Sequence, residues 1–197
     1  MKSASARDLK IGTAKEKDIK EIIELLYITE PYPEDEWGCG TEEEMKATLN
    51  KLLRIKENRF SLNNILVARK DDNLVGILLF LEGKDIDMLT SRSENAVIAM
   101  QKSLINKLKF IYYILSNWFL EECLEDEFYI ANLAIKPEYR KHGYSKIMIK
   151  EAKKLAKQKG YKKLSLLANN EKLVKFYETV GFQVENKKTR RMVANIT

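Results

Sequence analysis

The stretch LAIKPEYRKHGYSKIMIKEA, residues 133–152, decides how this chain folds. Its first three residues end the apolar run EFYIANLAI, residues 127–135, which predicts a strand that Pro137 ends. In its second half, apolar residues at helical spacing predict a helix from near Gly143 to about Lys159, with Gly160 as its C-terminal stop. The start of a helix presents unpaired backbone N–H groups and a partial positive charge, so it can bind phosphate. The stretch therefore predicts either an anion-binding loop or a simple strand-to-helix connection.

The composition of the loop and its surroundings favours an anionic ligand. Gly143 lets the backbone turn and lets a ligand approach closely, and Arg140 and Lys141 add positive charge. Residues 136–163 contain eleven Lys and Arg against two Glu, a net charge of +9 in a chain whose total is +6. A basic zone of this kind suggests an anionic ligand, and a solvated surface is the alternative.

The segment EPYPEDEWGCGTEEE, residues 30–44, has the opposite character. It carries seven acidic residues and no basic one. Such a segment suggests a cationic ligand, again with a solvated surface as the alternative. Glu34, Asp35 and Glu36 lie at its centre.

A second motif, NNEKLVKFYETVGF at residues 169–182, predicts a short helix that ends at Gly181. Asn170 and Tyr177 are seven residues apart, close to two helical turns, so they share a face. The two stretches, in this order, resemble the signature of the GNAT N-acetyltransferases. That signature reads R/Q-x-x-G-x-G/A after a strand and a proline, followed by N-x-x-A-x-x-F-Y-x-x-x-G-F. The resemblance covers roughly residues 127–182.

The resemblance implies a set of site residues and acetyl-CoA as the acyl donor. The loop would wrap the pyrophosphate of coenzyme A with Arg140, Lys141, His142, Gly143, Tyr144 and Ser145. Leu133, Ala134 and Ile135 would offer backbone groups to the pantetheine and the thioester carbonyl, and Asn170 would contact the pantetheine arm. Tyr177 would be the catalytic acid that protonates the departing thiolate. Alternatively, Tyr177 is a core aromatic residue beside Phe176, and Asn170 is a helix N-cap.

The chain departs from the family pattern at three places. Ser145 stands where Gly or Ala is usual, Leu173 replaces an alanine, and Ala131 and Asn132 occupy strand positions where many relatives have a carboxylate. A primary amine with a pKa near 10.4 must lose a proton before it attacks, which costs roughly 4.6 kcal/mol at pH 7. The candidate proton acceptors are Glu34, Asp35 or Glu36, which the family resemblance places near the acceptor, or the strand residues Glu127 and Tyr129.

The rest of the pattern predicts an α/β fold of one GNAT domain over residues 1–197. Its element order, βαα-ββ-α-β-α-β-α-ββ, implies a mixed and mostly antiparallel sheet flanked by helices. Residues 85–126 would insert an extra long helix between strands 3 and 4. That helix is apolar around much of its circumference, so we expect it to be buried, first of all against the domain and otherwise over the acceptor pocket or in a homodimer. Lys107 and Lys109 argue against its burial in a membrane, and no membrane partner is expected.

Several classes of protein do not fit the sequence. The start of the chain has no apolar signal segment, and the longest apolar stretch, residues 110–120, is only 11 residues long, whereas a membrane span needs about 20. Cys39 and Cys123 are expected as free thiols, and one histidine gives no metal site, which together predict a cytoplasmic protein. The basic region shows no aromatic interleaving of the kind that single-strand nucleic-acid binders use, so no nucleic-acid partner is expected.

The predicted activity is therefore transfer of an acetyl group from acetyl-CoA to a primary amine. The acceptor would be a cationic small molecule or a peptide or protein amine, with Asn132 and the acids at 34–36 as its contacts. The alternative is an acyl-CoA-binding regulatory module without catalysis, which the missing strand carboxylate favours.

Overall fold

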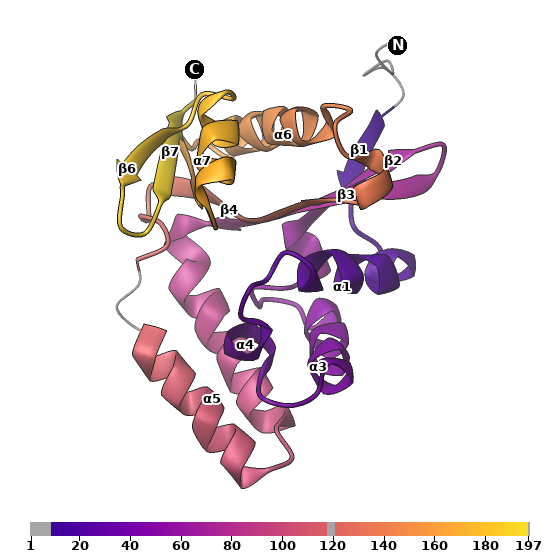
Figure 1. Ribbon diagram of the computed structural model, residues 1–197, viewed down its shortest axis with the longest axis vertical. Helices are drawn as coiled ribbons and strands as arrows, with labels where there is room; N and C mark the ends of the chain where they lie inside the picture. Colours follow the sequence, from indigo (N-terminus) through magenta and orange to yellow (C-terminus); the bar gives the residue numbers. More distant parts are fainter. Residues whose placement is uncertain (1–8, 118–120, 197) are drawn as a thin grey trace. The chain divides into compact units, whose positions relative to one another are not determined.

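The computed structural model describes residues 9–117 and 121–196 (Figure 1). The chain forms two compact units. The sheet unit comprises the described residues of Met1–Gly12, Leu66–Asp85 and Glu121–Thr197, and the helical unit those of Thr13–Ile65 and Ile86–Leu120. The expectation of a single domain over residues 1–197 stays a prediction.

A seven-stranded sheet forms the sheet unit, in the order β1-β2-β3-β4-β5-β7-β6. Its strands are β1 (Leu9–Thr13), β2 (Ile65–Lys70), β3 (Asn73–Glu82), β4 (Glu127–Ile135), β5 (Lys163–Leu167), β6 (Gln183–Asn186) and β7 (Arg191–Asn195). The β3–β4, β5–β7 and β6–β7 pairs are antiparallel, and the β4–β5 pair is parallel. The predicted mixed, mostly antiparallel sheet is confirmed.

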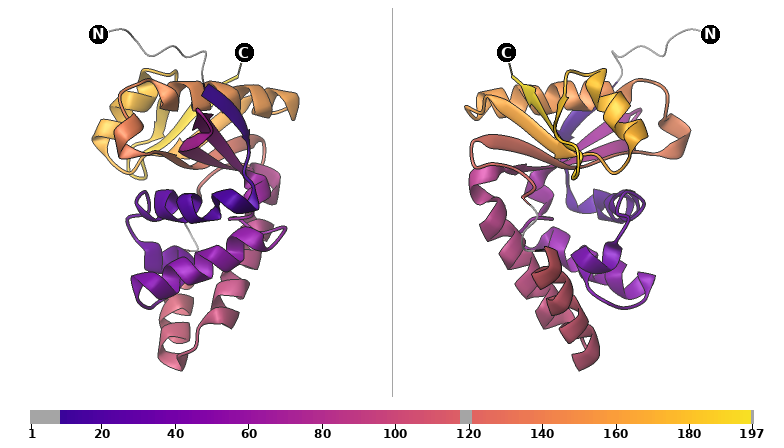
Figure 2. Two further views of the ribbon diagram at one scale, coloured as in Figure 1. Left: turned by 90° about the vertical axis from the view of Figure 1, so that its right-hand side faces the viewer. Right: turned by 60° about the vertical axis from the view of Figure 1, so that its left-hand side comes forward.

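Two helices lie on one face of this sheet, α6 (Tyr144–Gln158) and α7 (Glu171–Glu178) (Figures 1 and 2). Their apolar stripes bury Met148, Ala152 and Val174 together with the sheet residues Phe128 and Leu164. The alternation of strand residues explains this core, because every second side chain of a strand points to the same face. The core thus fixes the positions at which β4, α6 and α7 begin.

The helical unit consists of α1 (Ile19–Tyr27), α2 (Pro33–Trp37), α3 (Glu42–Arg54), α4 (Ile86–Met100) and α5 (Leu104–Asn117), with short 3₁₀ turns at Glu16–Asp18 and Leu62–Asn64. Thr41 starts α3 with a capping box, which the sequence pattern of Thr41 followed three residues later by Glu44 predicts: its hydroxyl accepts from the N–H of Glu44, and its own N–H donates to the Glu44 carboxylate. Trp37 is buried between the rings of Tyr27 and Phe60, 5.7 and 6.0 Å away between ring centroids. This aromatic cluster holds α2 in its unit.

The predicted helical insertion between β3 and β4 is confirmed, and it contains two helices, α4 and α5. Residues 101–103 separate α4 from α5, so the buried apolar side chains are not those expected of one continuous helix. Val97 is buried as expected and Phe110 is buried too, whereas one side of α5 exposes large apolar side chains in the single chain, so burial of that side in a homodimer stays a prediction. The predicted apolar residues Trp118 and Phe119 lie outside the described residues. No helix in residues 9–117 and 121–196 combines the length and the apolar character that crossing a membrane requires.

A buried ion pair links β4 to β7 within the sheet unit. The Arg191 guanidinium donates to the Glu127 carboxylate and also pairs with Glu185, and its Nε donates to the Glu122 carbonyl oxygen. Arg191 is 4% exposed and Glu127 is fully buried. The same Glu127 carboxylate accepts from the N–H of Leu124 at 3.0 Å. The pair therefore ties the segment before β4 to the C-terminal hairpin.

Gly83 lies where that segment passes closest to the end of β3. A Cβ at this position would clash with the Leu124 carbonyl oxygen and lie 2.9 Å from that of Glu127. We predict that Gly83→Ala lowers the free energy of unfolding by about 2 kcal/mol or more, because backbone atoms cannot move aside cheaply. Gly12→Ala is the matched control, since a Cβ there meets nothing within 4 Å. Urea unfolding curves with equal midpoints for the two variants would contradict this explanation.

Candidate active site

The candidate site begins where β4 and β5 separate. The two strands pair from Glu127 opposite Lys163 to Ile130 opposite Leu166, whereas β4 continues along β3 as far as Ile135. Opposite β3 the register shifts between Leu79, which faces Asn132, and Phe80, which faces Ile130. Ala131 is therefore the extra residue of a β-bulge, a feature that bends a strand locally. The second half of β4 consequently has an edge that β5 does not pair.

The direction of the backbone groups on that edge follows from one hydrogen bond. The N–H of Lys136 donates to the Val75 carbonyl oxygen of β3 at 2.9 Å. Because successive residues of a strand alternate in direction, Ala134 also directs its N–H and C=O toward β3, while Leu133 and Ile135 direct theirs to the other side. Of the three predicted backbone contributors, Leu133 and Ile135 thus face the unpaired edge.

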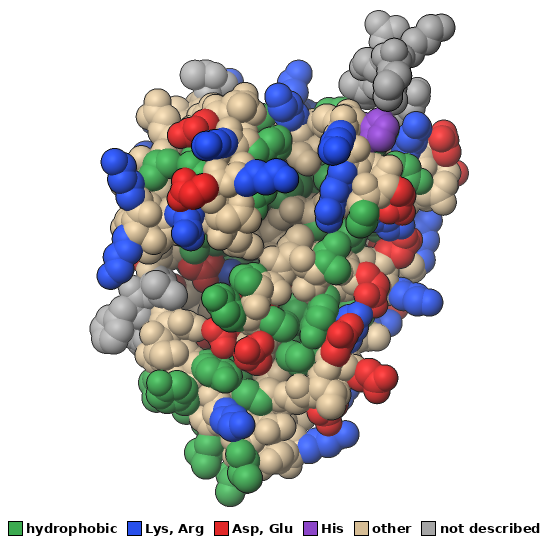
Figure 3. Space-filling view, viewed as in Figure 1, with side chains coloured by type: hydrophobic (Ala, Val, Ile, Leu, Met, Phe, Trp, Pro, Cys, Tyr) green, Lys and Arg blue, Asp and Glu red, His purple; other side chains and the backbone are tan. Residues whose placement is uncertain are grey.

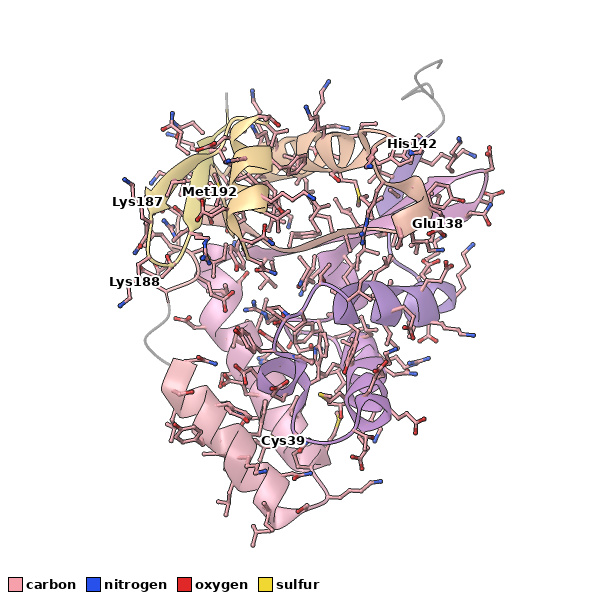
Figure 4. All side chains as sticks on the ribbon, in the orientation of Figure 1. Cys39, Glu138, His142, Lys187, Lys188 and Met192 are labelled. Carbon is pink, nitrogen blue, oxygen red and sulfur yellow. The ribbon has the colours of Figure 1, made fainter. Side chains whose placement is uncertain are left out.

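The loop after β4 is held in a defined shape. A 3₁₀ turn at Pro137–Tyr139 follows the strand, and Arg140 returns to it by donating from Nε to the Ile135 carbonyl oxygen at 3.1 Å. One ring nitrogen of His142, Nδ1, lies 3.2 Å from the Tyr139 carbonyl oxygen, and its ring stacks on Tyr144 at 5.7 Å. His142 and Glu138 project from this loop in Figure 4. Arg140 keeps further N–H donors, because a guanidinium has five.

The loop ends in an uncapped helix start. Gly143, the N-cap of α6, has φ +81°, and Lys141 before it also has a positive φ of 66°. No side chain caps the helix, and its first turn contains no acidic residue. Lys141, His142 and Gly143 are exposed, Ser145 is half-buried and Tyr144 is buried. The first N–H groups of a 15-residue helix are thus open to an anion.

Asn170 and Tyr177 occupy the start and the inner face of α7. The Asn170 side chain accepts from the N–H of Leu173 at 3.0 Å, so the N-cap expected as an alternative role is present, while its amide N–H₂ group remains exposed. The Tyr177 ring packs edge-on against Phe176 and Phe182, at 5.2 and 5.6 Å. The core-aromatic reading of Tyr177 is therefore correct for its ring.

The hydroxyl of Tyr177 behaves differently from its ring. It makes no hydrogen bond to a described residue, and Tyr177 as a whole is 8% exposed. Burial raises the pKa of this phenol to about 12. The group is therefore protonated at neutral pH and free to donate to a ligand.

The strand residues proposed as proton acceptors differ in their surroundings. The Glu127 carboxylate is fully buried and held in an ion pair with Arg191, so it is already engaged within the sheet unit. Its second oxygen and the Ser165 hydroxyl are buried without a partner among the described residues. The sequence did not reveal this cluster, because only the register brings β4, β5 and β7 together.

The acidic residues predicted for the acceptor site belong to the helical unit, in α2. The Asp35 carboxylate accepts from the Asn117 side chain at 3.3 Å, and partial burial raises its pKa. Glu36 lies 3.9 Å from Nε of the buried Arg59. Glu34 makes no hydrogen bond to a residue that the structure describes. The role of these acids toward an acceptor, and that of Asn132 in β4, stays a prediction.

A family model for the acetyltransferase (GNAT) family matches residues 22–182, most of the chain and all of the site in the sheet unit. The chain belongs to the GNAT acetyltransferase family. No curated protein matches it in sequence.

Solved structures of acetyltransferases share the GNAT fold of the chain. One acetyltransferase is 17% identical with a TM-score of 0.68, covering 95% of this chain and 100% of its own. An N-acetyltransferase from Staphylococcus aureus Mu50 is 20% identical with a TM-score of 0.65, covering 95% and 98%. The PaiA N-acetyltransferase from Thermoplasma acidophilum, crystallised in complex with coenzyme A, is 19% identical with a TM-score of 0.54, covering 95% and 98%.

Across residues 9–117 and 121–196, no group of three or more His, Cys, Asp and Glu side chains could hold an ion. The functional groups that the site offers are backbone N–H groups, basic side chains and the Tyr177 phenol.

The raised pKa of Tyr177 predicts a loss of stability at high pH. Above about pH 10 the phenol ionises in the unfolded chain but stays protonated in the fold up to about pH 12, so ionisation stabilises the unfolded state. Between about pH 9 and about pH 11 the parent should lose about 1 kcal/mol more of its unfolding free energy than Tyr177→Phe. Urea unfolding at both pH values measures this difference. An equal loss of unfolding free energy in both proteins would show that the Tyr177 phenol is exposed to water.

Proposed function

We propose that this protein transfers an acetyl group from acetyl-CoA to a primary amine. The observation that carries the proposal is the divergence of β4 from β5, with backbone groups of Leu133 and Ile135 directed at the unpaired edge. An N–H group fixed by the sheet can stabilise negative charge that develops on a carbonyl oxygen bound there, without reorganising during the reaction. A thioester supplies the acetyl group and a thiolate as the leaving group.

The loop and the start of α6 suit the diphosphate of coenzyme A. The uncapped N–H groups at the start of α6, the guanidinium of Arg140 and the ammonium of Lys141 all offer donors to an anion. Arg140 is already fixed to β4 through the Ile135 carbonyl oxygen, so its remaining donors need little ordering on binding. Ser145 adds a hydroxyl in the first turn of α6. The amide of Asn170 can contact the pantetheine.

Tyr177 is the proposed acid. Its ring is fixed by Phe176 and Phe182, its hydroxyl makes no hydrogen bond to a described residue, and its raised pKa keeps the proton in place at neutral pH. The position at which the proton is needed is the sulfur of the leaving thiolate.

A proton acceptor is needed for the amine, because its deprotonation costs roughly 4.6 kcal/mol at pH 7. Glu127 suits this task least, since Arg191 neutralises it. Asp35 has a pKa raised by burial, a change that makes a carboxylate a better acceptor. Tyr129, Glu34 and Glu36 remain open as acceptors.

The alternative function is an acyl-CoA-binding regulatory module without catalysis. It is favoured by Ala131 and Asn132, which place no carboxylate at the bulge of β4. Incubation with acetyl-CoA and a panel of amines, read by coenzyme A release and by mass spectrometry of the products, separates the two. Binding of coenzyme A without release in the presence of any amine would support the module.

The first prediction of this proposal concerns Gly143. A valine at φ +81° is strained, so Gly143→Val should distort the loop and weaken coenzyme A binding at least tenfold by calorimetry. The fold should survive, because a Cβ there meets nothing within 4 Å. Gly160→Val is the control: it has φ +87° and the same open space, but at the other end of α6. Equal affinities of the two variants for coenzyme A would show that the loop is not part of the binding site.

The second prediction concerns Tyr177. Tyr177→Phe keeps the aromatic packing and removes the proposed proton donor, so kcat should fall by about a hundredfold to ten-thousandfold. Affinity for coenzyme A should change little. Steady-state kinetics with the best amine from the panel, together with calorimetry, measure both quantities. If kcat stays at the parental value, the tyrosine serves packing alone.

The third prediction concerns the acids of α2. The double variant Glu34→Gln/Asp35→Asn should raise the acceptor KM, and added salt should raise it in the parent, because both weaken attraction of a cation. Glu36 is left unchanged since it lies near the buried Arg59. Asp71→Asn/Asp72→Asn, in the exposed β2–β3 turn, removes the same charge and should leave KM unchanged. An anionic amine as the best substrate would refute the role of these acids.

A further inference from the structure

One side of α5 exposes large apolar side chains in a continuous stripe. Leu104, Ile105, Leu108, Tyr112 and Leu115 are between 59% and 71% exposed and recur at helical spacing. In the lower part of Figure 3, where Figure 1 places α5, hydrophobic side chains gather around a basic side chain, with acidic side chains above them. Isolated exposed apolar residues are ordinary on proteins, but a contiguous stripe of this kind marks an interaction site.

The opposite side of α5 is fixed to its own unit. Phe110 is fully buried, the Asn106 side chain donates to the Cys39 carbonyl oxygen at 3.0 Å, and the Asn117 side chain donates to the Asp35 carboxylate at 3.3 Å. The helix is therefore held with a defined outward face. Of the acids of α2, Asp35 contacts this inward side through Asn117.

The charged side chains of α5 itself are positive. The described helix contains Lys107 and Lys109 and no acidic residue, and the exposed Lys102 precedes it. On a helical projection, Lys107 and Lys109 each lie about a quarter turn from the centre of the stripe, on opposite sides. An apolar face with lysines along both edges and a tyrosine among its residues is the pattern of helices that lie in a membrane interface. Lysine ammonium groups at such edges can reach phosphate groups while the aliphatic residues enter the acyl boundary.

We propose that α5 docks this protein on the surface of an anionic phospholipid bilayer. A second copy of the chain fits the stripe less well. Pairing two α5 helices would set lysines against lysines, with no acid on either helix to compensate. The five exposed side chains also fall short of the roughly 20–30 residues per partner found in standard protein interfaces. A bilayer requires no matching surface and supplies the negative charge.

The test is co-sedimentation of the full-length protein with lipid vesicles. Phosphatidylcholine vesicles with about one third phosphatidylglycerol should bind the protein more tightly than vesicles of phosphatidylcholine alone, and salt should reduce the difference. Leu108→Glu/Leu115→Glu should bind at least tenfold more weakly, because it places charge in the apolar stripe. Lys107→Gln/Lys109→Gln should lose about fivefold in binding per lysine, on anionic vesicles only.

Ile28→Glu/Ile55→Glu is the matched control, since both isoleucines are exposed on the helical unit outside α5. It should bind as the parent does. Because the substituted positions are exposed, each variant should fold, and circular dichroism verifies this. The proposal is overturned if the parent does not bind anionic vesicles, or if the α5 and control variants bind equally. It is also overturned if light scattering shows a dimer that only the Leu108→Glu/Leu115→Glu change dissociates, since the stripe would then bind a second copy.

Discussion

The sheet unit depends on the unequal pairing of β4 with its two neighbours. Along β3 the strand is paired to its end at Ile135, but along β5 it is paired only to Ile130. The bulge at Ala131 allows β4 to stay paired with β3 while it leaves β5, because an extra residue bends the strand without breaking the β3 ladder. The donors of the site, the loop after β4 and the start of α6 all take their positions from this divergence.

Backbone geometry supplies most of the chemistry that the site offers. Leu133, Ile135 and the first turn of α6 present N–H groups that are fixed before any ligand binds, so little ordering entropy is spent on binding. Side chains refine this arrangement: Arg140 bonds to the strand that it follows, and Asn170 caps the helix that carries Tyr177. The departures from the family pattern at Leu173 and Ser145 leave these backbone groups unaffected.

The buried Arg191–Glu127 pair shows how a group that looks reactive in the sequence can be structural. A carboxylate at the start of β4 is a candidate base until its partner is known. Two charges removed from water stabilise a fold only when each is paired, and Glu127 without Arg191 would be an uncompensated buried charge. Arg191 also contacts Glu185 and the Glu122 carbonyl oxygen, so it acts as a junction between β4, the segment before it and the last hairpin.

The sequence by itself determined the fold class, the position of the loop at residues 136–145, the caps at Thr41 and Asn170, and the family, because these depend on local periodicity, turn residues and short motifs. Only the tertiary structure decided that Leu133 and Ile135, rather than Ala134, face the unpaired edge, that Arg191 neutralises Glu127, and that the insertion is two helices with one exposed apolar side. Strand register and the pairing of distant residues cause this difference. A period of two residues fixes which side chains share a face, but it cannot say which strand lies alongside or where that strand ends.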